Sequence, residues 1–202
     1  MLQTGDGVPV RAAEGKRRAI LEAVLEVIAD TGLQSVTHRR VAATAGVPLG
    51  STTYYFRTRD DLIRAAFQHS LAGTDRLVSR LGHDRPAETV EQLALFMAEL
   101  AMREFEIPGR VRVEYELILA ASRDPLLAVT LHAAERVWIA GLAESLEALS
   151  VPRPLQVARA ILHLFRGFEV ERLTLPSADP AGLARRIIDL VSSARRDPAQ
   201  GA

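Results

Sequence analysis

Apolar residues recur every three or four positions through most of the chain, and no segment keeps a strict alternation of apolar and polar residues. A period near 3.6 residues gives a helix one apolar face, whereas a half-buried strand needs a period of two. Leu127, Leu131 and Leu142 belong to one such stripe, and breaks that contain proline, such as residues 82–86 and 177–180, separate the stripes. The sequence therefore predicts an all-α fold of about nine helices.

Composition narrows the class of protein further. With 202 residues, of which 48% are hydrophobic, the chain is long enough to bury a sizeable core in one or two domains. No apolar run approaches the roughly 18 to 20 residues that span a bilayer, and residues 1–18 lack the apolar region of a signal peptide. Because there is no cysteine, disulfides and thiolate metal sites are excluded. We therefore expect a cytoplasmic protein with no membrane partner.

Residues 35–59 contain four arginines and no Asp or Glu, and their turn signals define two short helices. Thr37 suits the N-cap of the first helix, because its hydroxyl can accept a hydrogen bond from the first turn. Gly46 can take the positive φ that ends this helix, and Pro48 suits the start of a second helix that we expect to end near Phe56. Two short helices and a tight turn in a basic segment are typical of a DNA-binding helix-turn-helix.

The distribution of charge favours the same interpretation. The chain as a whole is neutral, but residues 1–59 carry eight Lys/Arg and five Asp/Glu, an excess of three positive charges that residues 60–202 balance. Affinity for the phosphate backbone follows local basic charge, so the N-terminal part is the one suited to DNA. An asymmetry this small can also arise by chance, and that alternative stays open.

Several motifs between residues 16 and 67 stand in a specific order and spacing. They are a helix from Ile20 that ends in Thr31-Gly32-Leu33, the segment Val36-Thr37-His38-Arg39-Arg40-Val41-Ala42, the turn Ala45-Gly46-Val47, the aromatic run Tyr54-Tyr55-Phe56 and a basic residue before Asp60-Asp61-Leu62. In these features the chain resembles the DNA-binding domain of the tetracycline-repressor (TetR) family, over about a quarter of its length. One departure is Thr52-Thr53, where the family usually has Leu-Tyr or a similar pair. The phosphate contact of the family's tyrosine would then pass to Thr53 or Tyr54.

The resemblance implies a transcriptional regulator, most often a ligand-responsive repressor, that acts as a homodimer on a palindromic operator. Its implied partners are double-stranded DNA and an unidentified small-molecule effector, and no cofactor is implied. In the family, the helix that begins near Arg59 joins the two domains and swings when the effector binds. The expected organisation is a flexible arm (residues 1–14), a helix-turn-helix domain (15–61), a ligand-binding and dimerisation domain (62–195) and a flexible tail (196–202).

The resemblance also assigns roles within the helix-turn-helix. Thr37, Tyr54 and Arg59 would hold phosphates, and Arg39 would reach a guanine edge, where a guanidinium can bond O6 and N7 together. At least one residue of the Tyr55-Phe56 pair is expected in the core. The full set of candidate DNA-binding residues is Thr37, His38, Arg39, Leu49, Gly50, Ser51, Thr53, Tyr54, Tyr55 and Arg59.

The second domain would bind the effector and form the dimer. Aromatic and Met residues at helical spacing commonly fill a core, so packing remains an alternative for the ligand candidates. Likewise, the two C-terminal apolar stripes would form an intersubunit four-helix bundle, or pack only within one chain. The ligand-binding candidates are His69, Phe96, Met97, Tyr115, Glu116 and Trp138, and the dimerisation candidates are Val157, Ile161, Phe165, Phe168, Leu183, Ile187 and Leu190. Arg112 and Glu116 are also spaced for an i,i+4 ion pair on a solvated helix face.

Other function classes find less support. The sequence has no phosphate-cradling glycine loop, no Gly-x-Ser-x-Gly elbow, no cysteine nucleophile and no paired metal-ligand spacing among its five histidines. We therefore expect neither an enzyme nor a metal site. A helical adaptor that holds a protein partner with its apolar stripes is the remaining alternative. Such an adaptor would show no preferred DNA sequence, and it would leave the acid-free segment without a purpose.

Overall fold

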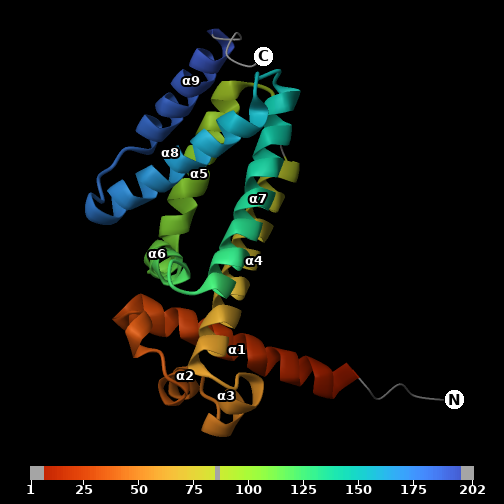
Figure 1. The fold of residues 1–202 in the computed structure, drawn as a ribbon, viewed down its shortest axis with the longest axis vertical. Helices are drawn as coiled ribbons and strands as arrows, with labels where there is room; N and C mark the ends of the chain where they lie inside the picture. The colour runs from red at the N-terminus through yellow and green to blue at the C-terminus, as the bar shows by residue number, and fades with distance from the viewer. Residues whose placement is uncertain (1–6, 85–86, 197–202) are drawn as a thin grey trace, which may run out of the picture. The chain divides into compact units, whose positions relative to one another are not determined.

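A computed structural model describes residues 7–84 and 87–196, with side chains described in residues 13–72 and 87–196. Every regular element in these residues is helical, and nine are α-helices, which confirms the predicted fold class (Figure 1). They are α1 (Gly7–Thr31), α2 (His38–Thr44), α3 (Leu49–Tyr55), α4 (Arg59–Asp84), α5 (Val90–Glu106), α6 (Arg110–Ala121), α7 (Pro125–Ala148), α8 (Pro154–Thr174) and α9 (Pro180–Arg196), with a 3₁₀ turn, η1 (Leu33–Ser35), after α1.

The first helix begins earlier than the sequence suggested. Residues 7–14, which we expected in a flexible arm, form the start of α1, whereas residues 1–6 lie outside the described part of the chain. Pro9 is compatible with this start because it lies in the first turn, where its missing N–H has no intrahelical partner to lose. At the other end, α9 finishes at Arg196, and the rest of the expected tail lies outside the described residues.

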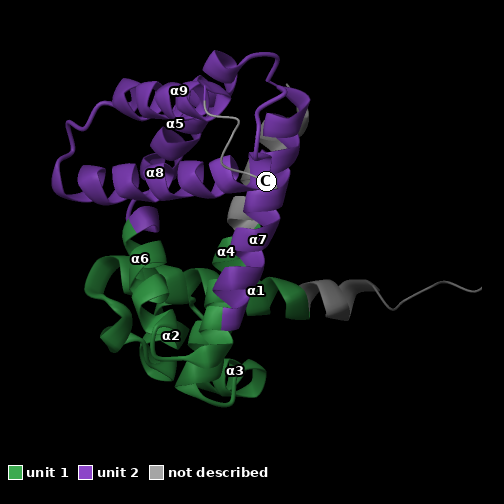
Figure 2. Ribbon diagram, turned by 45° about the horizontal axis from the view of Figure 1, so that its top comes forward, with its two compact units in different colours: residues 1–72, 112–128 green, residues 73–111, 129–202 purple. Residues whose placement is uncertain are grey.

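The chain divides into two compact units (Figure 2). Unit 1 comprises Met1–Ala72 together with Arg112–Ala128, and unit 2 comprises Gly73–Val111 together with Val129–Ala202. This division differs from the domain boundary that we expected near residue 61. Most of α6 and the first turn of α7 belong to the same unit as the helix-turn-helix, although they lie far from it in sequence.

In unit 1, buried apolar residues lie on α1, α2, α4 and α6. Ile20, Val24 and Leu62 are fully buried on α1 and α4, and Leu117 is fully buried on α6. Leu117 lies in the mid-chain segment that belongs to unit 1, so this segment contributes to the core as well as to the surface.

In unit 2, α9 packs along α5 and α8. The shared core includes Met97 of α5, Leu146 of α7, Phe168 of α8 and Ile187 of α9. Pro154 and Pro180 each begin a helix, where a fixed φ and a missing N–H suit the first turn. The start of α9 at Pro180 agrees with the break predicted at residues 177–180.

One described helix, α7, is long and apolar enough to cross a membrane by length and composition. The expectation that no apolar run reaches that length was wrong, because α7 stays apolar on average despite interruptions such as Glu135. One such helix is weak evidence for a membrane span. Within unit 2, Glu135 forms an ion pair with Arg166 of α8 at 2.9 Å, and Leu131, Leu142 and Leu146 are buried, so α7 packs as part of this unit.

Candidate nucleic-acid interface

The N-terminus of α2 is capped as the sequence predicted. Thr37 has an extended backbone, and its hydroxyl oxygen accepts a hydrogen bond from the Arg40 N–H at 3.2 Å. A cap of this kind satisfies one of the N–H groups that an α-helix leaves without a partner. Thr37 is exposed, and its hydroxyl proton is not needed for the cap, so the same side chain can donate to a phosphate oxygen.

The turn between α2 and α3 is a Schellman motif centred on Gly46. Gly46 has φ of 63°, the Val47 N–H bonds the Ala42 carbonyl at 3.0 Å, and the Gly46 N–H bonds the Ala43 carbonyl at 3.3 Å. The positive φ confirms the role predicted for this glycine. α3 then begins at Leu49, directly after Pro48. The two helices and their turn therefore form the predicted helix-turn-helix.

One face of α3 is exposed and carries most of the predicted contact residues. Tyr54 is 83% exposed and Leu49 is 49% exposed, while Gly50 and Thr53 are also exposed and Ser51 is half-buried. No atom lies within 4 Å of the position that a Cβ of Gly50 would occupy, so this side of the helix is open. The exposed face combines a phenol, a hydroxyl and small groups, which suit contacts to phosphates and base edges.

The Thr52-Thr53 pair divides between the core and the surface. Thr52 is fully buried, and its hydroxyl donates to the Leu49 carbonyl at 2.9 Å. Thr53 is exposed, and its hydroxyl donates to the Gly50 carbonyl at 3.2 Å, which leaves its oxygen lone pairs free of that bond. Thr52 therefore cannot reach DNA, and the surface position belongs to Thr53.

The aromatic run at the end of α3 attaches this helix to α1. Phe56 is 5% exposed, which confirms that at least one of the Tyr55-Phe56 pair lies in the core, and the guanidinium of Arg17 lies 5.5 Å from its ring centroid. Tyr55 is half-buried, and its hydroxyl donates to the Ala13 carbonyl at 3.0 Å. The Tyr55 hydroxyl was a candidate DNA contact, but in the structure it holds the N-terminal part of α1 against α3.

His38 and Arg39, the first two residues of α2, differ in accessibility. Both ring nitrogens of His38 are buried, and neither has a hydrogen-bond partner among the described residues. They do not face the solvent from which DNA would approach. Arg39 is exposed, as are Arg40 and Arg57. The accessible positive charge on this segment therefore comes from its arginines.

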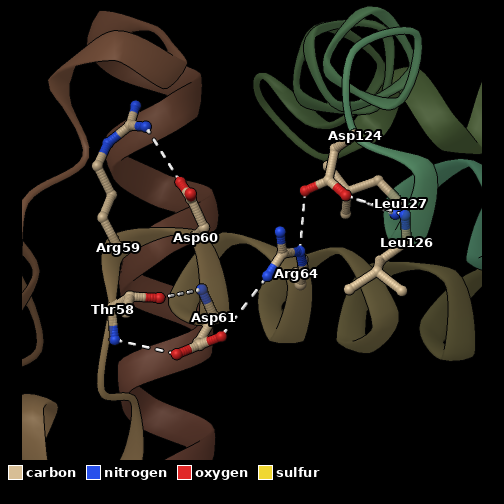
Figure 3. Close-up of polar contacts among 8 residues, drawn as sticks. All are labelled: Thr58, Arg59, Asp60, Asp61, Arg64, Asp124, Leu126 and Leu127. Atoms are coloured by element: carbon tan, nitrogen blue, oxygen red, sulfur yellow. Dashed lines mark hydrogen bonds and ion pairs between the residues drawn. The ribbon is translucent and has the colours of Figure 1, made fainter.

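Arg59 does not have the environment expected of a phosphate ligand. Its Nε donates to the Val36 carbonyl at 2.9 Å and its Nη2 donates to the Leu33 carbonyl at 2.8 Å. A third nitrogen lies 3.8 Å from the Asp60 carboxylate (Figure 3). The guanidinium is therefore occupied by the backbone between α1 and α2, and it fixes that connection from the first residue of α4.

The start of α4 carries a capping box. The Asp61 N–H donates to the Thr58 hydroxyl at 3.1 Å, and the Thr58 N–H donates to the Asp61 carboxylate at 3.1 Å (Figure 3). The side-chain hydrogen bond with Thr58 is the largest cause that lowers the pKa of Asp61, and the Thr58 N–H and Arg64 lower it further. This reciprocal pair fixes the point at which α4 leaves the helix-turn-helix.

Arg64 joins α4 to the mid-chain segment of unit 1. Its Nε donates to the Asp124 carboxylate at 2.8 Å, and Asp124 also accepts from the N–H groups of Leu126 and Leu127 at 2.9 and 3.4 Å (Figure 3). Burial alone would raise the pKa of Asp124, but the bonds from Arg64 and the two N–H groups lower it overall. Asp124 therefore caps α7 and holds the α6–α7 connection to α4 at once.

The predicted ligand-binding residues fall into both units. Phe96, Met97 and Trp138 come together in the core of unit 2, where Met97 is 2% exposed and the Trp138 ring lies 6.0 Å from that of Phe165. The remaining candidates, His69, Tyr115 and Glu116, belong to unit 1. There the Glu116 carboxylate accepts a hydrogen bond from the Leu33 N–H, instead of pairing with Arg112 as its spacing suggested.

The residues predicted to form the dimer interface pack mainly in the core of unit 2. Leu190 of α9 is half-buried, and the other six are part of the buried core of unit 2. Their stripes therefore hold α8 and α9 against α5 and α7. The exposed apolar residues of α8 are different ones, namely Leu155, Val170 and Leu173.

A buried ion pair in unit 2 was not singled out from the sequence. Glu104 of α5 is 3% exposed, and its carboxylate pairs with the guanidinium of Arg110, the first residue of α6. Burial raises the pKa of Glu104, and Arg110 opposes that shift. The only available signal was a Glu on an otherwise apolar face of α5, which does not identify its partner.

Family models match both parts of the chain. Residues 20–66 match the model of bacterial regulatory proteins of the tetR family, and residues 88–194 match the tetracyclin repressor-like C-terminal domain. The chain belongs to the TetR family. It is thus a helix-turn-helix transcriptional regulator of a non-enzymatic family, as the resemblance indicated.

Curated helix-turn-helix transcriptional regulators match this TetR-family chain over part of their length. The regulator PksA of Bacillus subtilis is 36% identical over 101 residues, which cover 46% of this chain and 48% of PksA. The regulator BetI 1 of Chromohalobacter salexigens is 37% identical over 76 residues, which cover 38% of this chain and 36% of that protein. The TetR-family chain therefore spans about half or less of the curated relatives that it matches.

Solved structures match over most of this TetR-family chain. The multidrug binding protein EbrR, in its complex with imidazole, is 31% identical, with a TM-score of 0.67, and the match covers 87% of this chain and 94% of EbrR. A TetR-family member from Streptomyces coelicolor is also 31% identical, with a TM-score of 0.68 and coverage of 87% and 97%. Other EbrR structures contain proflavin, ethidium or malachite green.

Proposed function

We propose that this TetR-family regulator is a homodimeric repressor that binds a roughly palindromic operator and releases it when a small molecule binds. The observation that carries the proposal is the exposed face of α3, presented by a capped helix-turn-helix in a chain that matches the family in both of its parts. In the adaptor alternative, this polar, partly aromatic face would have no partner to explain it.

Within the operator complex, we assign base reading to Arg39 and to the exposed face of α3. Arg39 is exposed at the start of α2, and Gly50 and Thr53 allow the backbone of α3 to approach the major groove closely. Thr37 and Tyr54 hold phosphates, because both present an exposed hydroxyl beside this face. Arg59 acts indirectly by holding the backbone that precedes α2.

The homodimer forms through the outward faces of α8 and α9, while their inward stripes fill the core of unit 2. Leu155, Val170 and Leu173 expose 61%, 47% and 40% of their surface on α8. Gly167 lies on the same helix, and no atom stands within 4 Å of its Cβ position, so a second helix can approach closely there. A two-fold axis would place two copies of α3 about one DNA turn apart.

The effector is an organic small molecule bound in unit 2. Support comes from EbrR, a relative whose structures contain imidazole and several dyes. Phe96 and Trp138 are half-buried and offer aromatic surface to such a ligand, whereas Met97 would first have to move out of the core. To release DNA, the effector must bind more tightly to the conformation that does not fit DNA. The ratio of its affinities for the two conformations limits how far the affinity for DNA can fall.

Selection of bound fragments from random duplex DNA, at low and near-physiological salt, tests this function. An enriched palindrome with half-sites about one helical turn apart is the expected result. Weak binding that disappears with salt and enriches no sequence would leave only electrostatic attraction and would favour the adaptor. A monomeric mass at micromolar concentration would count against the homodimer.

A further inference from the structure

The carboxylate of Glu116 in α6 contacts the turn that connects α1 to α2. Its Oε2 accepts a hydrogen bond from the Leu33 N–H at 2.5 Å, across 83 positions of sequence. Gly32 has φ of 85°, and a Cβ placed there would lie 3.5 Å from both carboxylate oxygens. The carboxylate therefore rests against the backbone of Gly32 and Leu33, where a Cβ at position 32 would be at van der Waals distance from it, and the positive φ is what favours glycine at that position.

Arg59 holds the same turn from another side. Its guanidinium bonds the carbonyls of Leu33 and Val36, so both polar backbone groups of Leu33 have charged partners. Hydrogen bonds to charged groups are stronger than those between neutral ones. Only Val36 separates the end of the turn from Thr37, the cap of α2, so the position of the turn determines where the helix-turn-helix starts.

The α6 segment that carries Glu116 is fixed to unit 1 at a second point. Arg64 bonds Asp124 just beyond the end of α6, eight residues after Glu116. Between these two contacts, Leu117 is fully buried in the same unit. A segment from the middle of the chain thus forms part of the support of the DNA reader.

We propose that Glu116 is a positioning residue for DNA binding, whose carboxylate holds the Leu33–Ser35 turn, and through it α2 and α3, in the orientation that fits the operator. This inference rests on the proposed function and deepens it. Glu116 was first considered as a ligand anchor, but the contact that it makes is with the DNA-binding unit. α6 begins at Arg110 in unit 2 and carries Glu116 in unit 1. A shift of α6 would therefore move the Leu33–Ser35 turn through Glu116, in addition to any movement that Arg59 of α4 transmits to it.

The test uses the full chain and compares Glu116→Ala and Glu116→Gln with the wild type. Glu99→Ala serves as the matched control, because Glu99 forms an exposed ion pair with Arg103 at 2.5 Å on α5. The measurements are hydrogen exchange at the Leu33 amide by NMR, affinity for the selected operator, affinity for random duplex DNA, and the melting temperature.

For Glu116→Ala we expect Leu33 exchange to accelerate and operator affinity to fall, each by about tenfold or more, which corresponds to losing a hydrogen bond to a charged acceptor. Affinity for random DNA should stay within about twofold, because no phosphate contact is removed. Glu116→Gln keeps an acceptor oxygen without the charge, so it should lose only about twofold to threefold in operator affinity relative to the wild type. Glu99→Ala should change none of these quantities.

Several results would overturn the proposal. Unchanged Leu33 exchange in Glu116→Ala would mean that the contact does not hold the turn. Accelerated exchange with an unchanged operator-to-random affinity ratio would mean that the contact is merely structural. If Glu116→Ala does not fold, Glu116→Gln decides: a twofold to threefold loss of operator affinity at an unchanged melting temperature supports the proposal, and no loss refutes it. A wild-type chain without any operator preference would instead show that the proposed function itself fails.

Discussion

Replacing Arg59 by alanine separates two roles that an arginine at the first position of α4 can have, namely holding the preceding backbone and contacting a phosphate. In the structure, its guanidinium donates to the carbonyls of Leu33 and Val36, at 2.8 and 2.9 Å. Hydrogen bonds from charged donors contribute about 1.5–3 kcal/mol each when buried. Because the side chain is 38% exposed, we reduce the expected loss to about 2 kcal/mol for the pair.

The assay compares the free energy of unfolding, from urea titration, with the salt dependence of operator binding. Arg59→Ala should lower the free energy of unfolding by about 2 kcal/mol and leave the slope of log affinity against log salt unchanged. Arg57→Ala, at a neighbouring exposed arginine, should change the free energy of unfolding by less than about 0.5 kcal/mol.

The reasoning would be refuted by the opposite pattern for Arg59→Ala. A phosphate contact contributes about 0.9 to the salt slope, so losing one contact in each subunit of a dimer would make the slope shallower by about 1.8. A shallower slope of that size, with an unchanged free energy of unfolding, would mean that Arg59 faces DNA in the complex. Its bonds to the backbone would then be secondary.

Four further predictions concern the exposed residues of the helix-turn-helix and the start of α4. Tyr54→Ala should weaken binding to all DNA sequences alike. Arg39→Ala should also relax sequence preference, by about 1–3 kcal/mol at the base pair that Arg39 reads. Equal losses of affinity for operator and random DNA in Arg39→Ala would exclude Arg39 as a base reader. Thr58→Ala should lower the free energy of unfolding by about 1 kcal/mol through the lost cap, as measured by urea titration. Because folding lowers the pKa of Asp61, its ionised carboxylate stabilises the folded state at pH values above its ordinary pKa near 3.8, and this stability is lost as the pH falls through the lowered pKa. Asp61→Asn should therefore remove this part of the acid dependence of the melting temperature.

Local features of the helix-turn-helix could be predicted from the sequence because their partners are near neighbours. The Thr37 cap depends on an N–H three residues away, and the Gly46 turn depends on carbonyls within five residues. Helix periodicity likewise identified the apolar faces of α8 and α9. Such interactions follow from helix geometry and turn chemistry, which the sequence alone specifies.

The partners of charged side chains could not be predicted in the same way. Glu116 has the i,i+4 spacing for a pair with Arg112, yet its partner is a backbone N–H 83 positions away. Arg59 looked like a phosphate ligand, yet it bonds carbonyls 23 and 26 positions earlier. Periodicity predicts that Phe168 is buried, but it does not identify the residues that bury it. The core of one chain and an interface between two chains produce the same apolar stripe in the sequence.

The membership of residues 112–128 in unit 1 has a consequence for building hybrid regulators. A chimera joined at residue 61 or 72 would graft the DNA reader without Leu117, which is fully buried in unit 1, and without the carboxylates of Glu116 and Asp124. The grafted piece would then present bare apolar surface and a Leu33 N–H without its acceptor, and a graft that extends to residue 72 would also carry Arg64 without its Asp124 partner. The DNA-binding unit of this protein is therefore discontinuous in sequence. A hybrid regulator that exchanges unit 2 must keep residues 112–128 together with residues 1–72.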